Sequence, residues 1–365
     1  MPPLFRHMAL LAACIGPVVA QTWTHCNPTE EDCEPNPALG TNHTWSFNET
    51  LDDKIWNTTN GEINFTDEGA EFTIASKLQS PTLQSTFYIF FGIIEMQVKM
   101  AAGPGIVSSV VLQSDDLDEI DWEWVGYNTS EIQTNYYSKG VTNYENGEFF
   151  WVDNADTEFH NYTTHWTEEK IEWWVDNELL RTLTYEETKN GSEYSYPQTP
   201  SNVRIGIWPA GDPDNAQGTI DWAGGPVDYD AGPYTMTVKD VRVHDFHTGK
   251  EYEYGDNSGT WQSINVIEGN STALEEINKP PPKSMSEKWD ELPQGAKVGV
   301  YVGAAAGGSI LLALFIFFFI RQRKKGRLEH ALDDSKFNAE RTEMNDFQSN
   351  WKQSEWRHGG YQPVR

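Results

Sequence analysis

Between residues 70 and 245, apolar and polar side chains alternate in short runs, which Gly, Asn, Asp and Pro residues separate. Successive side chains of a β-strand point to opposite faces, so this alternation is typical of strands that bury one face. No long helical periodicity competes with it. We therefore expect an all-β domain over residues 21–267, built from two packed antiparallel sheets. The clearest runs are 71–75, 91–100, 107–113, 119–125, 170–176, 202–208 and 234–243.

The N-terminus has the pattern of a secretory signal peptide. An apolar run over 8–15 follows Arg6, and small or modest residues lead to Ala20. Cleavage after Ala20 would remove residues 1–20 and Cys14 with them. The mature chain would then enter an oxidising compartment.

A second apolar run, 298–320, contains no charged residue and is long enough to cross a bilayer. Arg321 opens a basic flank, so the positive-inside rule places the C-terminus in the cytosol and residues 21–297 outside. A glycolipid-anchor signal is the alternative, but it requires the apolar run at the very end of the chain. Because a polar segment, 321–365, follows here, we predict a type I transmembrane helix.

The segments around this helix are polar. Residues 268–297 carry charges and three consecutive prolines, which favours a stalk. Residues 321–365 lack apolar periodicity, which predicts a disordered cytosolic tail. Gly299, Gly303 and Gly307 either form a face for helix dimerisation or are small residues that a membrane helix tolerates.

Composition narrows the choice of partner. The formal net charge of −29 disfavours binding to nucleic acid, whereas a neutral polysaccharide is compatible with it. The chain has 15 tryptophans, which fit either a thick sandwich core or a surface that stacks on rings.

Cysteines and glycosylation signals agree with an extracellular domain. Cys26 and Cys33 are expected to pair as a disulfide that closes a short loop, because two free thiols are unusual outside the cytosol. Eight Asn-X-Ser/Thr sequons are candidate glycosylation sites. They are Asn42, Asn48, Asn57, Asn64, Asn128, Asn161, Asn190 and Asn270.

One predicted strand, 119–125, carries the candidate chemistry. Its alternation places Glu119, Asp121 and Glu123 on one face and apolar side chains on the other. Three like charges in a row are unfavourable unless solvent or function relieves them, so a solvated acidic face is the plain alternative. Retaining glycoside chemistry uses two carboxyl groups about 5–5.5 Å apart, as nucleophile and as acid. Two glutamates four residues apart on a strand must lean together to reach that separation, and an inverting pair stays possible.

Other catalytic signatures are weak. Gly-x-Ser-x-Gly is missing, and no His/Cys cluster suggests zinc, so we expect no cofactor and assign no metal site. His160 and His165 fit strand or loop packing better than a catalytic role.

The stretch from Asp118 to Gly126 resembles the Glu-x-Asp-x-Glu signature of glycoside hydrolase family 16, in its fungal Crh branch of chitin–glucan transglycosylases. Segments 159–166, 171–176, 204–211 and 218–225, together with the Cys26–Cys33 start, are also similar to that family. The resemblance covers residues 21–265 and implies a β-jelly roll.

It also implies the roles of individual residues. Glu119 would be the nucleophile, Asp121 its helper, and Glu123 both the proton donor and a substrate contact. Arg204, Trp208 and Thr219 would line sugar subsites. Many relatives carry a glycolipid anchor and some a cysteine-rich chitin-binding module, and this chain departs from both patterns.

The resulting hypothesis is a cell-wall transglycosylase at the plasma membrane. It would cleave β-1,4-linked chitin with retention and transfer it to β-glucan or chitin. An endo-hydrolase of chitin or β-glucan would share every catalytic residue. A non-catalytic wall-binding membrane protein is the third possibility, but it would not need all three carboxylates.

Overall fold

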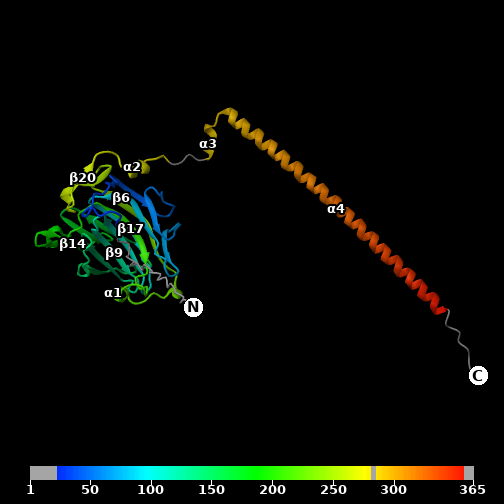
Figure 1. The fold of residues 1–365 in the computed structure, drawn as a ribbon, viewed down its shortest axis with the longest axis horizontal. Coiled ribbons are helices and arrows are strands. Elements are labelled where there is room, and N and C mark those ends of the chain that lie inside the picture. The colour runs from blue at the N-terminus through cyan, green and yellow to red at the C-terminus, as the bar shows by residue number, and fades with distance from the viewer. Residues whose placement is uncertain (1–22, 281–284, 357–365) are drawn as a thin grey trace, which may run out of the picture. The chain divides into compact units, whose positions relative to one another are not determined.

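The computed structural model describes residues 23–280 and 285–356, so the predicted signal peptide lies outside the described residues (Figure 1). The chain divides into two units, a compact β-rich unit that ends at Lys279 and a helical unit from Pro280 onwards.

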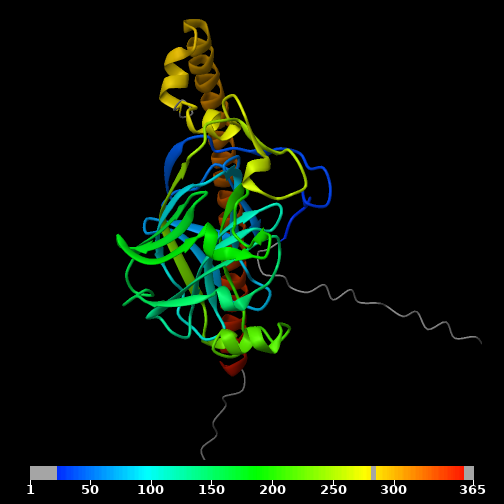
Figure 2. The same cartoon turned by 90° about the vertical axis from the view of Figure 1, so that its left-hand side faces the viewer.

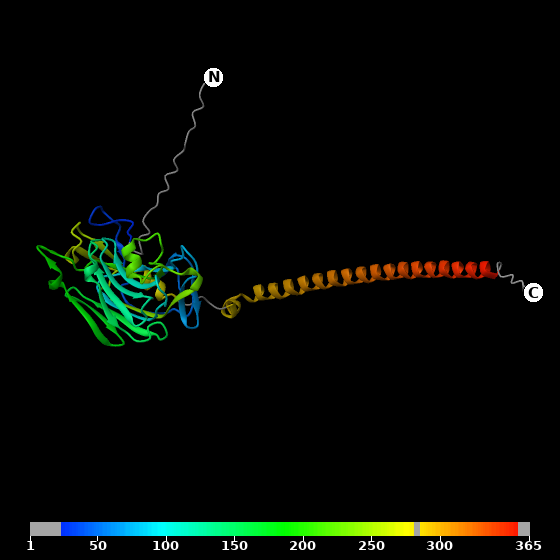
Figure 3. The same cartoon turned by 90° about the horizontal axis from the view of Figure 1, so that it is seen from below.

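The β-rich unit is a sandwich of two large antiparallel sheets, which Figures 2 and 3 show as curved layers. The predicted all-β jelly-roll fold is confirmed. The first sheet has the order β11 (Glu148–Trp151), β10 (Glu131–Tyr137), β9 (Glu119–Val125), β8 (Val107–Ser114), β17 (Ser201–Trp208), β6 (Thr82–Ile89) and β3 (Trp56–Asn60). The second has the order β14 (Glu178–Thr184), β13 (Lys170–Val175), β12 (His160–Trp166), β7 (Gly92–Lys99), β18 (Tyr234–Asp245), β5 (Gly69–Ile74) and β4 (Ile63–Thr66), and β2 (Asn42–Ser46) also pairs with β18.

Short elements complete this unit. A small sheet joins β1 (Asn36–Pro37), β19 (Glu251–Tyr254) and β20 (Ile264–Ile267), and a hairpin joins β15 (Lys189–Asn190) to β16 (Glu193–Tyr194). Helix α1 (Gln217–Trp222) lies at the opposite end of the unit from α2 (Thr272–Ile277) (Figure 2). Four 3₁₀ turns are η1 (Tyr144–Asn146), η2 (Tyr185–Thr188), η3 (Tyr229–Ala231) and η4 (Trp261–Ser263).

Strand β9 joins the two sheets through its inward face. Trp122 and Trp124 are buried and meet the ring of Tyr162 on β12 edge to face, with centroids 5.3 and 4.7 Å apart. The Trp122 indole donates a hydrogen bond of 2.9 Å to Thr164 Oγ1 on the same strand. The predicted division of β9 into an apolar and an acidic face is therefore correct, and its apolar face fixes the strand against the opposite sheet.

The β-rich unit extends further than the expected boundary at residue 267. Ser271 caps α2 by accepting a 2.9 Å bond from the Leu274 amide, and its hydroxyl donates to the Leu39 carbonyl at 2.8 Å. Ala273 is buried in the main core. The first part of the predicted stalk is thus part of the folded domain, because one short capped helix has an apolar face that packs on it.

The helical unit contains α3 (Met285–Glu291) and the long helix α4 (Gln294–Trp356). Among the described residues, α4 is the one helix long and apolar enough to cross a membrane. The sequence predicts disorder after residue 320, whereas α4 continues to Trp356. Between 327 and 356 the chain has no Gly or Pro and many Glu, Lys, Arg, Ala and Leu residues, so backbone propensity favours helix there without a packed core.

Candidate active site

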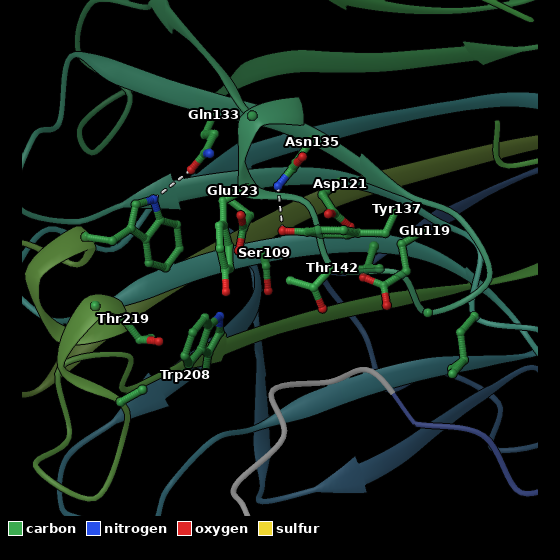
Figure 4. A pocket seen from close by; sticks show the side chains of 18 of the residues that line it. Ser109, Glu119, Asp121, Glu123, Gln133, Asn135, Tyr137, Thr142, Trp208 and Thr219 are labelled. Carbon is green, nitrogen blue, oxygen red and sulfur yellow. Dashed lines mark hydrogen bonds between the residues drawn. The ribbon is translucent and has the colours of Figure 1, made fainter. Parts of the chain in front are cut away.

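A groove of about 970 Å³ lies on the face of the first sheet that points away from the core. Strand β9 contributes Glu119, Asp121 and Glu123 to it, and Figure 4 shows the three carboxyl groups in a row along the strand. Glu119 and Asp121 are buried, whereas Glu123 is half-buried. The sheet thus brings the three predicted carboxylates together in one concave site.

The register of the neighbouring strands surrounds each carboxyl group with a side chain from either side. Residues paired across a sheet share a face, and of the six partners all but Gln113 line the groove. Glu119 pairs with Tyr137 and Gln113, Asp121 with Asn135 and Val111, and Glu123 with Gln133 and Ser109. Sequence reasoning missed these neighbours, since alternation reveals a strand's faces but not which strands pair.

Two hydrogen bonds hold the groove's polar side chains in place. The Asn135 amide donates to the Tyr137 hydroxyl at 2.8 Å, next to Asp121 (Figure 4). The Trp222 indole donates to Gln133 Oε1 at 2.9 Å. Burial, followed by the charge of Asp121, raises the pKa of Tyr137, so this hydroxyl stays neutral and can act as a donor.

Burial and the repulsion between neighbouring carboxylates keep protons bound to Glu119, Asp121 and Glu123, which we call the acidic row. Burial raises the pKa of Asp121 to about 7. Burial and then the charge of Asp121 raise the pKa of Glu123 to about 8. The same two causes raise the pKa of Glu119 well above its ordinary value, while the cation of Arg204 acts in the opposite direction. Near neutral pH the three groups therefore share protons, as a pair of acid and base requires.

The turn before β9 is fixed by a carboxyl group that sequence analysis did not single out. Buried Asp118 accepts hydrogen bonds from the Ser138 hydroxyl at 2.7 Å, the Lys139 amide at 3.0 Å and the Gln198 amide at 2.8 Å. It thereby ties the start of β9 to the end of β10 and to the segment before β17. Since Glu119 is the next residue, this junction sets where its side chain enters the groove.

Trp208 and Thr219 line the groove as predicted substrate-binding residues would. Trp208 ends β17 and stacks on Trp222 of α1, with ring centroids 6.1 Å apart and planes 27° apart. Thr219 lies on α1, and Figure 4 shows it beside Trp208. Trp208 and Thr219 thus belong to elements, β17 and α1, that are distant in sequence from β9.

Arg204 lies beside the groove and faces a smaller cavity of about 330 Å³. Its side chain is buried and donates to Asn202 Oδ1 at 2.9 Å and to the Trp23 carbonyl at 3.1 Å. The predicted Cys26–Cys33 disulfide is formed and lines the same cavity. Arg204 therefore acts on Glu119 electrostatically, and Trp23 in the N-terminal segment contacts the Arg204 side chain.

Among the described residues, no group of three or more His, Cys, Asp or Glu side chains is arranged to hold a metal ion. The chemistry available in the groove is that of the carboxyl, amide and hydroxyl groups already described.

Asp121→Asn should move the alkaline limb of the pH–activity profile to lower pH. The charge of Asp121 raises the pKa of both glutamates, so its removal lowers both. Whichever glutamate is the acid then loses its proton at a lower pH. The measurement is kcat/KM against pH. Thr142, an uncharged residue that also lines the groove, provides the control, since Thr142→Val should leave the limb in place. An unmoved or alkaline-shifted limb in Asp121→Asn would contradict the electrostatic account.

Comparison with known proteins agrees with this geometry. The profile of glycosyl hydrolases family 16 matches residues 50–224. The chain is 66% identical to "Crh-like protein 3" of Aspergillus fumigatus over 98% of each chain, and 49% identical to a "Crh-like protein" of Arthroderma benhamiae over 98% of this chain and 96% of that one. The structure of the "Crh5 transglycosylase in complex with NAG" matches with a TM-score of 0.64 and 47% identity, over 66% of this chain and 99% of that chain. The chain therefore belongs to the Crh-like proteins of glycosyl hydrolase family 16.

Proposed function

We propose that this protein is a cell-wall transglycosylase that cleaves β-1,4-linked chitin with retention and transfers the released chain to β-glucan or chitin. The supporting observation is the row of three carboxyl groups with raised pKa values in one groove. The similarity of the chain to a Crh5 transglycosylase supports transfer rather than hydrolysis alone.

In the first step, a carboxylate oxygen of Glu119 attacks the anomeric carbon of the donor sugar. The bond to the leaving oxygen breaks, and Glu123 gives its proton to that oxygen. The products are a glycosyl ester on Glu119 and a free chain end. In the second step, Glu123 takes the proton of an acceptor hydroxyl, whose oxygen attacks the same carbon and frees Glu119.

The assignment of these two roles rests on the resemblance of residues 119–123 to the family motif, and the charge of Arg204 supports it. Like charges make it unfavourable for both glutamates to ionise together, so one of them keeps a proton. The cation of Arg204 opposes the raised pKa of Glu119, and it is not among the causes that set the pKa of Glu123. Arg204 thus acts toward the charged form of Glu119, which suits a nucleophile, while burial and the charge of Asp121 raise the pKa of both glutamates.

The function is tested with the full-length protein in detergent, given chitin oligomers and a labelled β-glucan oligomer. We expect labelled hybrid chains, together with fewer free reducing ends as acceptor concentration rises. Equal release of reducing ends with and without acceptor would identify a hydrolase instead. Binding without any cleavage would identify a wall-binding protein.

Glu119→Gln and Glu123→Gln should fail at different steps. Glu119→Gln lacks the nucleophilic oxygen, so no donor should form a covalent adduct. Glu123→Gln should still react with a donor that carries an activated leaving group, which needs little protonation, and the adduct should accumulate because no base activates the acceptor.

Mass spectrometry of the enzyme after mixing with an activated donor measures both variants. An adduct located on Glu123, or one that survives Glu119→Gln, would reverse the assignment.

We propose a type I orientation in the plasma membrane, with the β-rich unit facing the cell wall. Support comes from the predicted signal peptide, from the basic residues after Ile320, and from the sequon asparagines, most of which are exposed. Protease added to wall-free intact cells should spare an epitope fused after Arg365, and deglycosylation should lower the apparent mass. Cleavage of that epitope would show the opposite orientation.

A further inference from the structure

Strand β11, at the edge of the catalytic sheet, presents aromatic side chains to solvent on the groove face. Phe149 pairs with Gln133, which pairs in turn with Glu123, and Trp151 pairs with Glu131 two residues along β10. Since paired residues share a face, Phe149 and Trp151 both lie on the face that carries the acidic row. Their side chains are 47% and 66% exposed, although their type is usually buried.

A third aromatic, Tyr144 in turn η1, lines the same groove and is 81% exposed. The turn that carries it is firmly attached. The Asn146 amide donates to the Tyr136 carbonyl at 2.9 Å, and buried Arg181 donates to the Asn146 carbonyl at 2.8 Å. Tyr144 is therefore exposed on a fixed support.

Trp151 is also oriented. Its indole nitrogen donates to Asp153 Oδ1 at 2.8 Å, which occupies the polar edge of the ring and leaves the faces for contact. We call Tyr144, Phe149 and Trp151 the edge platform. Exposed aromatic side chains on one face beside a groove are typical of a binding surface.

The edge platform lies on the side of β9 away from β17, and Phe149 is level with Glu123, the group proposed to handle the proton of the leaving or accepting oxygen. Along the sheet, β11 is two strands from β9 on one side, and β17, which carries the groove residue Trp208, is two strands away on the other. Neighbouring strands are about 4.8 Å apart, so each set lies about 10 Å from the acidic row. A saccharide cleaved at β9 thus has one side of the groove for its donor part and the other for the chain that leaves or accepts.

The chemistry of the platform fits a neutral sugar chain. Aromatic faces contact the apolar C–H faces of pyranose rings, and the strongly negative protein disfavours anionic polymers. We propose that the edge platform is the acceptor subsite, which holds a neutral β-linked polysaccharide against the glycosyl-enzyme. This inference rests on the proposed transglycosylase function and assigns its acceptor side.

Acceptor binding can be measured without catalysis in the full-length Glu119→Gln protein in detergent, by titration calorimetry with a β-glucan oligomer and with a chitin oligomer. Adding Trp151→Ala should weaken acceptor binding about tenfold, the size expected for an aromatic anchor. Trp151→Phe should restore most of it. Phe246→Ala is the matched control, since Phe246 is an exposed aromatic beside β18 of the other sheet, and it should leave binding unchanged. Equal affinities with and without Trp151 for both oligomers would overturn the proposal.

Kinetics in the active protein separate acceptor from donor. Trp151→Ala and Phe149→Ala should raise the acceptor KM about tenfold and shift the products toward hydrolysis. Without acceptor, hydrolysis of a donor whose small activated leaving group does not reach the platform should stay within about twofold of the parent. If donor hydrolysis falls as much as transfer does, the platform belongs to the donor side and the proposal is wrong.

A parent protein that forms no transfer product would refute the transglycosylase function. Loss of oligomer binding in Trp151→Ala would still identify the platform as a glycan site, so the two failures are distinguishable.

Discussion

The alternation of strand β9 is the constraint on which the site depends. The same seven residues bury Trp122 and Trp124 against the opposite sheet and aim Glu119, Asp121 and Glu123 into the groove. A slip of one residue in register would exchange the faces, with carboxylates in the core and indoles in solvent. The tryptophan packing and the Trp122–Thr164 hydrogen bond therefore hold the catalytic row in register as well as stabilising the sandwich.

The electrostatics of the groove depend on that register too. Because the row lies on an interior strand of a seven-stranded sheet, neighbouring strands exclude water from Glu119 and Asp121, and this burial is the main reason that their pKa values rise. The one cation that opposes this rise at Glu119 is supplied by β17 and covered by the Trp23 carbonyl. The N-terminal segment at Trp23, just before the disulfide-closed loop, is thereby coupled to the acid–base balance, although it is not among the described residues that line the main groove.

The sequence predicts those features that depend on neighbours along the chain. The alternation of 119–125 is sufficient to find both faces of β9, and the charge-free run 298–320 is sufficient to find the candidate span. Asp118 could not be recognised, because its function is to accept hydrogen bonds from Ser138, Lys139 and Gln198, which only the folded chain brings near it.

The same limit applies to the edge platform. Phe149 and Trp151 lie in a short run with too few residues to show a period, and only pairing with β10 assigns them to the face that carries the groove. The docking of α2 was missed for a related reason, since six helical residues give little periodic signal and Ser271 alone marks the start. Long-range pairing and short elements thus account for what local patterns leave out.

The continuity of α4 has a consequence for the segment beyond residue 320. Starting a helix in water is unfavourable, whereas extending an existing one adds a hydrogen bond for each residue that is fixed. The apolar part of α4 would act as a permanent nucleus in the bilayer, where backbone groups can be satisfied only within the helix. Residues 321–356 would therefore stay helical as long as they remain attached to the apolar part. The same peptide, once cleaved from it, would lose that nucleus and its helix would unfold.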